Sequence, residues 1–574
     1  METVFEKLIE SIVHENPQTK EELNSLRTKF TSQLKINQPP TRELLQAYQN
    51  LLKKKSISRN EILESLLRKA DIRTTSGISV ITSLVKPYTC PGKCVYCPTE
   101  IRMPKSYIAT EPAAARALRL DFSPYEQMRQ RILMLKQNGH ATDKIEYIIK
   151  GGTWNAYPLR YQYWFILESF RACNELSQKA RKHRKHENTK TRKQIELNEN
   201  SKLEDLQNAL EIEQRKNENS KHRIIGLTLE TRPDAISPKT IYHMRRQGCT
   251  RIELGLQAPD DKILELIKRG HTVQQFKDAI LLLRDAGFKV DLHFMPDLPG
   301  TTPEHDVEMY KLIFSDPALR PDMIKIYPNT VIKTAELYQW FVDGRYKPYG
   351  DEALFNALLE MKLATPRYCR ISRLIRDIPA TEIEAGNVVT NLRELLEAKL
   401  KQQGKKCVCL RCREISRQQK NIDQSAEAFL FVDEYETTGG KEYFLTYEDK
   451  NRTAVFGFLR LRIPDLLNIK TKSVEQLYEY MPEIKNCAFI RELHVYGTLV
   501  QIGKQNKDAS QHKGFGKKLM AAAEAVVKEK IAEERNSQIK KIAVISGVGV
   551  RGYYRKIGYR KVGTYMIKNL QNNK

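Results

Sequence analysis

The chain lacks the features that would place it in a membrane or outside the cell. No run of 18 consecutive apolar residues occurs among its 574 residues, so no membrane-spanning helix is expected. The amino-terminal stretch alternates acidic and apolar side chains and has neither the basic nor the apolar region of a signal peptide. The ten cysteines do not suit a secreted disulfide framework, because six of them fall into two tight clusters. These absences predict a cytoplasmic protein with cysteine-bound metals.

Positive charge, by contrast, is in excess. The chain has 96 Lys and Arg against 70 Asp and Glu, a net charge of +26. An excess of this size favours a polyanionic partner, and nucleic acid is the most common one. Basic insertions without any partner are the alternative. The length also exceeds what one hydrophobic core usually holds, so about two or three domains are expected.

Short apolar strands alternate with helical stretches over residues 75–395. The candidate strands are residues 78–84, 144–150, 223–230, 250–256, 288–295, 322–327 and 368–374. Because helices separate most of them, the pattern predicts an α/β fold of the partial (β/α) barrel type. Residues 1–74 are expected to form a small helical region instead, in which Lys53, Lys54 and Lys55 are either a phosphate-contacting end or a solvated helix terminus.

Three further stretches complete the expected organisation. Residues 176–222 are almost wholly polar, so an insertion that buries no core is expected, either mobile or a solvated pair of helices, and either passive or in contact with RNA. Residues 396–426 contain the second cysteine cluster and are expected to be a zinc-binding linker. Residues 427–574 form a separate α/β unit, in which four antiparallel strands precede a helix beginning at Gly514. That order is typical of acyl-CoA folds rather than dinucleotide folds.

The most informative motif is PYTCPGKCVYCP, which follows the first strand and contains Cys90, Cys94 and Cys97. The C-x3-C-x2-C spacing can supply three thiolates to a [4Fe-4S] cluster and leave the fourth iron open. An open iron can bind S-adenosylmethionine (SAM), whose reductive cleavage gives a 5′-deoxyadenosyl radical. A zinc knuckle or a disulfide cluster are the alternatives. Zinc, however, needs four ligands, and no partner pair lies near.

The second cluster, Cys407, Cys409 and Cys412 in KKCVCLRCRE, is compact enough for a structural zinc ion. The fourth ligand would then come from elsewhere in the chain. Cys369, Cys249 or a histidine are the candidates. Three reduced surface thiols are the alternative.

Polar residues stand at the ends of several predicted strands. The strand-end residues are Gly151, Gly152, Thr153, Glu230, Gln257, Lys325 and Tyr327. The carboxyl ends of parallel strands meet at one mouth, where chemistry collects in such folds. The glycines allow backbone groups to receive the SAM amino group. Lys325 and Tyr327 are candidates for a nucleotide pocket, because lysine pairs with phosphate and tyrosine stacks on bases; packing is the alternative for both.

The run QHKGFGK opens a long helix in the carboxy-terminal unit. Its glycines would let backbone N–H groups approach a pyrophosphate at the helix N-terminus. With RELHVYG before it and ISGVGVRGYYRKIGY after it, the unit resembles the GNAT acetyltransferase fold over residues 427–574. The candidate acetyl-CoA-binding residues are Glu492, Leu493, His494, Val495, Gln511, His512, Lys513, Gly514, Phe515, Gly516, Lys517 and Tyr553.

That fold also places a tyrosine near the CoA sulfur as a general acid. Tyr553 and Tyr554 occupy the matching position, and the sequence does not choose between them; packing is the alternative. Glu492 is a candidate base, or else a strand-end carboxylate in an ion pair.

Together the two halves resemble one family, the catalytic subunit of Elongator in its archaeal and bacterial branch, over nearly the whole chain from about residue 70. The motifs that carry the resemblance include KPYTCPGKCVYCP, GHATDKIEYIIKGGTW, GLTLETRPD, KRGHT, HFMPDLPGTTPEHD, IKIYPNTVIKTAELYQ, RDIPATEIEAGN, QHKGFGKKL and GVRGYYRKIGY. The 176–222 insertion departs from the family pattern.

The resemblance implies a tRNA-modifying enzyme that uses a SAM-derived radical and acetyl-CoA to install a carboxymethyl group on C5 of the wobble uridine. It implies a [4Fe-4S] cluster, SAM, acetyl-CoA as substrate and zinc. The implied partner is the anticodon stem-loop of a tRNA, with a homodimer or accessory Elongator-like subunits besides. The alternatives are a protein lysine acetyltransferase with a structural iron–sulfur cluster, a methylthiotransferase and a non-catalytic tRNA-binding scaffold.

Overall fold

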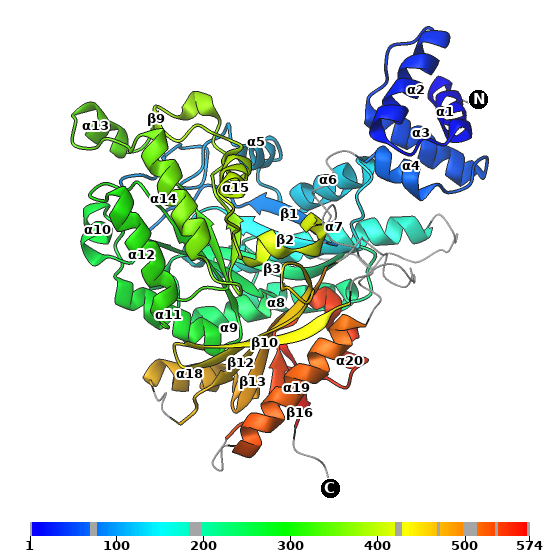
Figure 1. The fold of residues 1–574 in the computed structure, drawn as a ribbon. Coiled ribbons are helices and arrows are strands. Elements are labelled where there is room, and N and C mark those ends of the chain that lie inside the picture. Colours follow the sequence, from blue (N-terminus) through cyan, green and yellow to red (C-terminus); the bar gives the residue numbers. More distant parts are fainter. Residues whose placement is uncertain are drawn as a thin grey trace.

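The computed structural model describes residues 3–68, 77–182, 197–418, 427–467, 471–496, 514–533 and 538–570. Three parts follow one another along the chain: a helical bundle, a large sheet surrounded by helices, and a second sheet (Figure 1). The bundle stands at one corner, whereas the two sheet domains pack against each other. Two α/β units behind a small helical region confirm the predicted fold class.

Short capped helices build the amino-terminal bundle. They are α1 (Val4–Glu15), α2 (Lys20–Gln33), α3 (Thr41–Lys54) and α4 (Glu61–Leu66). Thr3 and Glu6 cap α1 reciprocally, each side chain accepting the other's backbone N–H. The apolar faces meet around Leu44 and Leu51. Lys54 is turned toward the bundle, since it pairs with the buried Glu6 at 2.8 Å.

Seven parallel strands form the central sheet. They are β1 (Ser79–Leu84), β2 (Lys144–Lys150), β3 (Arg223–Thr231), β4 (Arg251–Gln257), β5 (Lys289–Phe294), β6 (Met323–Ile326) and β8 (Arg370–Arg373). They lie side by side in that order, and each neighbouring pair is parallel. All the predicted strands of this domain occur, with ends shifted by at most two residues. β4 lies mid-sheet and is buried at every position.

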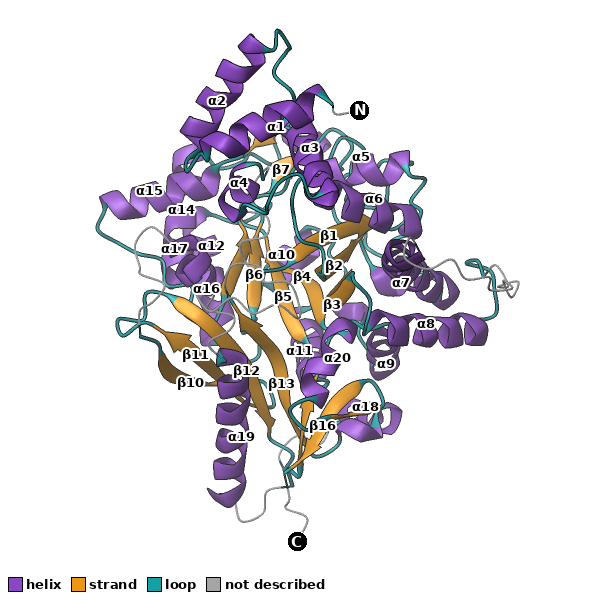
Figure 2. Cartoon of the chain, turned by 90° about the vertical axis from the view of Figure 1, so that its right-hand side faces the viewer, coloured by secondary structure: helices purple, strands orange, loops and turns teal. Residues whose placement is uncertain are grey.

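Helices connect these strands and cover the sheet (Figure 2). They are α5 (Pro112–Arg119), α6 (Pro124–Gln137), α7 (Leu159–Lys182), α8 (Leu203–Asn217), α9 (Pro238–Arg246), α10 (Asp261–Leu266), α11 (Val273–Asp285), α12 (Pro303–Ser315), α13 (Leu337–Val342) and α14 (Asp351–Ala364). Within the described ranges, none of the helices combines the length and apolar content needed to cross a membrane.

The polar stretch 176–222 is not wholly a solvated insertion. Its helix α8 packs along α7 and buries Leu206 and Leu210 in the main core. The side-chain amide of Asn217 donates to the His222 carbonyl at 2.9 Å. The expectation that this stretch buries no core is therefore wrong for α8, because two leucines at helical spacing suffice when a neighbouring helix supplies the rest of the apolar surface. Residues 183–196 lie outside the described part.

The second cysteine cluster also belongs to a packed region. The helices α15 (Leu392–Gln402), α16 (Leu410–Arg413) and α17 (Ile415–Gln418) follow the barrel. Leu396, Leu400 and Leu410 are buried in the core that they share with the sheet. Residues 392–418 thus form part of the core instead of the expected linker.

The second sheet has the order β10-β11-β12-β13-β14-β16-β15. Its strands are β10 (Phe429–Thr437), β11 (Gly440–Glu448), β12 (Val455–Pro464), β13 (Cys487–Val495), β14 (Lys541–Val544), β15 (Arg560–Val562) and β16 (Tyr565–Asn569), and its helices are α18 (Lys472–Tyr480), α19 (Phe515–Glu533) and α20 (Arg551–Arg555). After α20 the chain ends in a hairpin formed by β15 and β16. β13 and β14 are parallel but pair only as far as Ile490 and Val544.

Glycines bring the two sheet domains into close contact. Gly547 and Gly549 precede α20 and lie against β3. A Cβ at Gly549 would come 2.6 Å from the Cβ of Arg223, and one at Gly547 would overlap the Ile225 carbonyl. The GVGVRGYY motif therefore also allows the two sheet domains to pack closely against each other.

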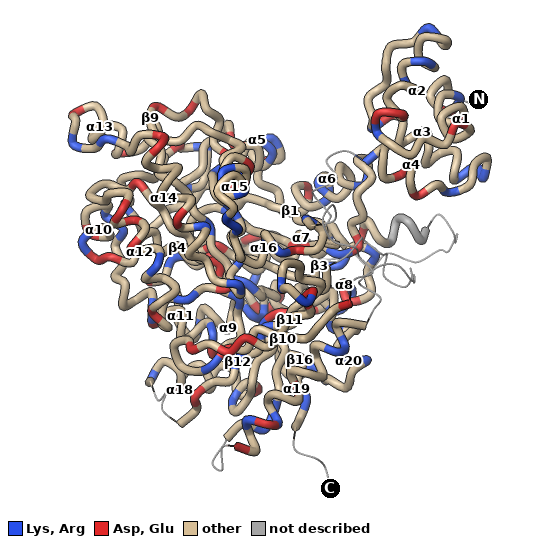
Figure 3. Tube along the Cα trace, viewed as in Figure 1, with Lys and Arg blue, Asp and Glu red and all other residues tan. Residues whose placement is uncertain are grey.

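A buried set of charges spans the same junction. We call it the junction cluster, and it comprises Arg284, Asp285, Asp322, Glu442, Arg460, Arg462 and Arg491. Arg491 of the second sheet donates to Asp322 of the first domain at 2.6 Å and to Glu442 at 2.8 Å. Buried charges need such partners. Lys and Arg occur in all three parts of the molecule, interspersed with Asp and Glu (Figure 3).

Candidate active site

A cavity of about 1500 Å³ lies where the two sheet domains meet. Its walls come from the strands of the central sheet, the cysteine loop after β1, β13, β14 and the start of α19. The predicted residues that line it are Cys90, Cys94, Cys97, Gly152, Thr153, Glu230, Gln257, Lys325, Tyr327, Glu492, Leu493, His494, Val495, Gly514, Gly516, Lys517, Tyr553 and Tyr554. Residues predicted for two different cofactor sites thus face one space.

The loop after β1 presents its three thiols to this cavity. Cys94 is buried, whereas Cys90 and Cys97 are half-buried. The hydrogen bond with Cys97 lowers the pKa of the Cys94 thiol to about 4, and the positive charge of Arg269, whose Nη1 lies 3.5 Å from Cys94 Sγ, acts in the same direction. The same hydrogen bond raises the pKa of the Cys97 thiol, so the loop favours one thiolate, at Cys94, which is the form that binds iron.

Two arginines and a glycine fix this loop. Arg232 donates to the Arg269 carbonyl at 2.8 Å, and Arg269 donates to the Gly255 carbonyl at 2.7 Å. Gly92 lets the loop pass the guanidinium of Arg232, because a Cβ at this position would overlap it. Three cavity-facing thiols beside two cations fit an anionic thiolate-bound [4Fe-4S] cluster.

The glycine-rich end of β2 lies beside the cysteine loop. Thr153 Oγ1 lies 3.7 Å from Cys90 Sγ. Gly151 and Gly152 have φ angles of +137° and +84°, which other residues rarely adopt. A Cβ at Gly151 would also overlap Val85. The backbone thus reaches the cavity without intervening side chains, as the predicted SAM contact requires.

Gln257 ends β4 in an unusual conformation. Its φ is +78°, and the register of β4 against β5 shifts just before it. Its Oε1 is buried and has no hydrogen-bond partner among the described residues. A buried acceptor of this kind is costly, so a bound ligand would stabilise it.

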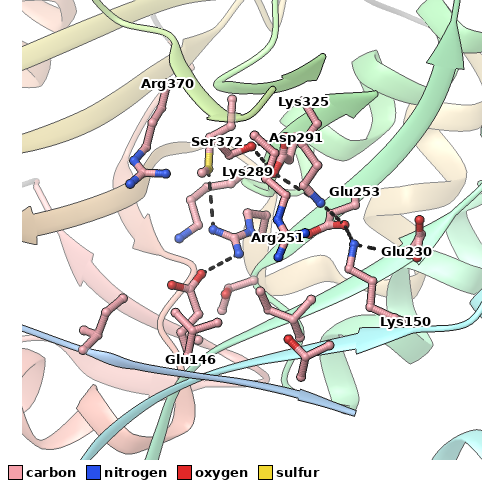
Figure 4. A pocket seen from close by; sticks show the side chains of 18 of the residues that line it. Glu146, Lys150, Glu230, Arg251, Glu253, Lys289, Asp291, Lys325, Arg370 and Ser372 are labelled. Atoms are coloured by element: carbon pink, nitrogen blue, oxygen red, sulfur yellow. Dashed lines mark hydrogen bonds and ion pairs between the residues drawn. The ribbon is translucent and has the colours of Figure 1, made fainter. Parts of the chain in front are cut away.

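Charged side chains from five neighbouring strands converge at the mouth of the partial barrel (Figure 4). Glu253 of β4 pairs with both Lys150 of β2 and Lys325 of β6. His293 Nε2 lies 3.4 Å from Glu253, and Glu230 lies 3.9 Å from Lys150 Nζ. We call these five residues the mouth cluster.

The mouth cluster is balanced by lysines. Burial alone would raise the pKa of Glu253, but the charges of Lys150 and Lys325 hold it well below its usual value. Burial lowers the pKa of Lys325 to about 8, against the opposing effect of Glu253. The ligand atoms of Glu230, Glu253 and His293 lie within 4.8 Å of one another. Two ammonium groups already neutralise them, so the group needs no metal ion.

Of this cluster, Glu230 and Lys325 were predicted from the sequence, whereas Lys150, Glu253 and His293 were not. Glu253 and Gln257 both line the cavity from β4, although the register shift before Gln257 interrupts the alternation of the strand. The available signal was a charged residue inside the apolar strand RIELGLQ, four residues before the predicted Gln257. Tyr327, which was predicted, stands next to the cluster, with its ring 5.5 Å from that of His293.

On the opposite wall, residues 492–495 of β13 lie beyond the last residue of β13 that pairs with β14. Glu492 pairs with Arg460 at 2.9 Å and with Lys289 at 3.3 Å. Burial opposes ionisation, yet these cations hold the pKa of Glu492 at about 2. A carboxylate this acidic is a poor proton acceptor at neutral pH, so the geometry favours the ion-pair role over the catalytic base.

α19 begins at the cavity. Gly514 precedes it with a φ of +75°, and a Cβ at Gly516 would lie 3.0 Å from the Tyr553 hydroxyl. The helix N-terminus favours an anion such as a pyrophosphate, and Lys517 adds charge there. Phe515 instead packs into the core. The predicted contacts Gln511, His512 and Lys513 lie outside the described residues.

The two tyrosines of α20 differ in their surroundings. The Tyr553 hydroxyl is buried without a hydrogen-bond partner in the described part of the chain, and burial raises its pKa to about 12. Tyr554 packs against Tyr559, with ring centroids 6.2 Å apart. A protonated hydroxyl without a protein partner is available to a ligand, which makes Tyr553 the better candidate for the general acid.

The second cysteine cluster lies at the edge of the cavity wall. The Sγ atoms of Cys407, Cys409 and Cys412 lie within 4.8 Å of one another, a donor set that fits zinc. Neither Cys369 nor Cys249 belongs to this group of neighbouring thiols, and the Cys249 thiol donates to the Arg251 carbonyl at 3.2 Å. Over the described ranges, no fourth His, Cys, Asp or Glu atom lies within that distance of all three.

Known protein families and relatives match the chain over most of its length. The radical SAM superfamily matches residues 84–313 and the radical SAM C-terminal domain residues 321–402. The tRNA uridine(34) acetyltransferase of Methanocaldococcus infernus is 40% identical over 91% of each chain. That of Dehalococcoides mccartyi is 38% identical over 87% of this chain and 99% of its own. Elongator complex protein 3 of Saccharomyces cerevisiae is 35% identical over 96% of this chain and 92% of its own.

A solved structure agrees with these matches. The archaeal Methanocaldococcus infernus Elp3 with an N-terminal deletion covers 86% of this chain and 99% of its own, with a TM-score of 0.67 and 37% identity. The matched lengths include both sheet domains, so the resemblance drawn from the motifs is confirmed. The chain belongs to the family of tRNA uridine(34) acetyltransferases and Elongator complex protein 3, whose first sheet domain is a radical SAM domain.

Proposed function

We propose that the protein modifies tRNA by joining a carboxymethyl group, drawn from acetyl-CoA, to C5 of the wobble uridine. The observation that carries the proposal is the cavity of about 1500 Å³, which has the cysteine loop in one wall and β13 with the start of α19 in another. A reaction that couples an acetyl group to an extruded base requires one enclosed space for both. Two relatives are named for tRNA uridine 34, which supports this choice of substrate.

The barrel side of the cavity would hold the radical-generating groups. When bound, a [4Fe-4S] cluster and SAM supply a radical that abstracts a hydrogen atom. Cys90, Cys94 and Cys97 would ligate the cluster, and the strand end at Gly152 would receive SAM. The unpartnered Oε1 of Gln257 would accept a hydrogen bond from it.

The mouth cluster would receive the uridine. Glu253 fixes the ammonium groups of Lys150 and Lys325 in one place. Lys325 would donate to an acceptor of the base or its phosphate, and Tyr327 would offer a ring for stacking. Glu230, which accepts a hydrogen bond from Tyr107 at 2.9 Å, would orient the neighbouring lysine.

The second sheet would hold acetyl-CoA. The N-terminus of α19, with Gly514, Gly516 and Lys517, would take the pyrophosphate. Tyr553, beside Gly516, would hold the thioester and protonate the CoA thiolate when water hydrolyses the thioester bond. Zinc on the second cysteine cluster would be structural and tie residues 392–418 to the barrel.

The proposal is tested by anaerobic reconstitution of the cluster, followed by incubation with reductant, SAM, tRNA and methyl-labelled acetyl-CoA. We expect labelled 5-carboxymethyluridine in the digested nucleosides by mass spectrometry, and no product when SAM is omitted. Cys94→Ser should abolish the product by removing a cluster ligand. Gly516→Glu should abolish it by placing bulk and negative charge against Tyr553.

The same reactions separate the alternative. A protein lysine acetyltransferase with a structural cluster would transfer label to protein without SAM and in air. Labelled protein together with unmodified tRNA would therefore contradict the proposal. The net charge of +26 favours the RNA substrate, because a polyanion is then bound with release of counterions.

A further inference from the structure

An arginine between two cysteines of the second cluster faces the cavity and has no ion-pair partner among the described residues. Arg411 lies in α16, between Cys409 and Cys412, and lines the cavity. Its Nε is buried and has no hydrogen-bond acceptor, and its guanidinium has no ion-pair partner within the described part of the chain. Such a charge is normally paired when water is largely excluded from it.

Further positive charge surrounds this guanidinium. Arg370 of β8, Arg393 of α15 and Arg417 of α17 are close enough to act on it electrostatically. Arg370 and Arg417 also line the cavity. The guanidinium of Arg370 stands apart from the mouth cluster, so the two groups of cations serve different parts of the cavity (Figure 4).

One carboxylate, Glu414, pairs with two of these arginines. It accepts from Arg370 Nε at 2.7 Å and from Arg417 Nε at 3.1 Å, and the Tyr496 hydroxyl donates to it at 3.3 Å. Both of its oxygens are thus engaged. Three cavity-lining arginines against one carboxylate leave an excess of positive charge, and the guanidinium that carries it is that of Arg411.

We infer that Arg411, with Arg370 and Arg417 beside it, forms a phosphate-binding subsite in the cavity wall, and that its ligand is a backbone phosphodiester of the substrate RNA. A guanidinium binds two phosphate oxygens at once, which suits a single unpartnered arginine. RNA is favoured over acetyl-CoA because the N-terminus of α19 and Lys517 already provide for a pyrophosphate. The choice of RNA rests on the proposed function.

With zinc bound, the cysteines on either side of Arg411 would make this subsite rigid. A loop tied by three thiolates to one ion would leave the backbone of Arg411 little freedom, so the side chain would be held ready before the ligand arrives. The second cysteine cluster would then serve substrate binding through Arg411, besides stabilising the fold.

The test measures binding of an anticodon stem-loop RNA by fluorescence anisotropy at several salt concentrations. Arg411→Met should weaken binding about tenfold at low salt and reduce the slope of log K against log salt by about 1. Lys405→Met is the matched control: it removes one positive charge from an exposed position six residues before Arg411, outside the cavity lining. It should leave the slope unchanged.

A second measurement keeps the inference testable if Arg411→Met loses its metal or its fold, which metal analysis and thermal unfolding would reveal. Arg417→Met changes the same subsite from outside the cysteine run and should weaken binding in the same direction. RNAs with a single neutral methylphosphonate are the complementary probe. The wild-type protein should lose affinity at one phosphate near the wobble position, and a folded Arg411→Met protein should be indifferent to that replacement.

Acetyl-CoA binding by calorimetry distinguishes the two sources of phosphate. Weaker RNA binding with unchanged acetyl-CoA binding supports the inference as stated. Weaker acetyl-CoA binding alone keeps the phosphate subsite but overturns RNA as its ligand. Unchanged binding of both, with no sensitive phosphate, overturns the subsite. Product formation by the wild-type enzyme is scored separately, so failure of the subsite and failure of the proposed function are told apart.

Discussion

The junction cluster and the mouth cluster are both buried sets of charges, but they are built from different cations. In the junction cluster arginines face carboxylates, and Arg491 alone reaches Asp322 and Glu442 with bonds of 2.6 to 2.8 Å. In the mouth cluster two lysines share Glu253. The first cluster joins two domains, whereas the second lines the cavity.

The difference follows from the chemistry of the two cations. A guanidinium stays charged in proteins and holds several acceptors in fixed directions. The charge of Arg491 keeps the pKa of Asp322 far below its usual range, although burial opposes it. An ammonium group is a point charge that burial can neutralise, and burial lowers the pKa of Lys325 to about 8. Arginine thus suits a permanent junction, and lysine suits a site that exchanges contacts with a substrate.

Breaking the junction cluster should have the largest effect. Arg491→Met leaves Asp322 and Glu442 buried beside an apolar side chain, so we expect the free energy of unfolding to fall by about 3–5 kcal/mol. Urea unfolding measures it. Lys311→Met is the control, because Lys311 pairs with Glu360 at 3.7 Å on the surface and both side chains are exposed. That change should cost at most about 1 kcal/mol. Equal losses of stability in both variants would mean that the junction cluster stabilises the fold no more than a surface ion pair does.

Breaking the mouth cluster should affect the reaction as well as the fold. Glu253→Gln keeps the shape but removes the charge that holds Lys150 and Lys325, so both ammonium groups lose their common anchor. We expect the rate of nucleoside modification to fall about 100-fold, as for other misplaced catalytic groups, and the free energy of unfolding to fall too, because two largely buried ammonium groups lose their carboxylate. Glu384→Gln, which removes a surface partner of Lys333 at 3.2 Å, is the control. A Glu253→Gln enzyme with normal rates would show that the cluster is only structural.

The two clusters also differ in how much of them could be predicted from the sequence. The strands of the barrel, the cysteine loop after β1 and the glycines of the β2 end were predictable, because each depends on local periodicity or spacing. Arg491 and Asp322 were not, since their partnership joins residues far apart in the chain and each looks like an interruption of an apolar strand. α8 was missed for the same reason: the apolar surface that orders it belongs to α7.

A third kind of buried carboxyl has no cation beside it among the described residues. Asp306 accepts from the Asp297 backbone N–H at 2.7 Å and from the Tyr349 hydroxyl at 3.0 Å. Burial raises the pKa of Asp306 to about 7. The folded protein then keeps a proton that the unfolded chain releases above about pH 4. Its contribution to stability is complete below that pH, falls as the pH rises to 7, and stays constant above.

The free energy of unfolding should therefore lose about 2 kcal/mol between pH 5 and pH 7 on account of Asp306. Asp306→Asn carries no titrating proton, so its unfolding free energy should change less over this interval, as urea titrations at a series of pH values would measure. Parallel pH profiles of the two proteins would mean that Asp306 is ionised in the folded state. Asp322, which arginines hold ionised, should contribute no slope in this range.

The smallest expected effect concerns Lys325, which alone in the mouth cluster has its pKa near working conditions. It faces Glu253, Asp291, Glu230, His293 and Lys150. Above pH 8 it loses its charge, so only about a tenth of the enzyme keeps the ammonium at pH 9. We expect the modification rate to fall about tenfold from pH 7 to pH 9.

Lys325→Arg separates this titration from other effects of pH. A guanidinium stays charged across the range, so the variant should keep a level profile to pH 9, at a lower plateau because its geometry differs from that of an ammonium group. Initial rates between pH 6.5 and 9.5 give the comparison. If the rates of both enzymes decline together, a group other than Lys325 titrates. The difference between the arginine and lysine clusters would then lie in their geometry and not in their charge states.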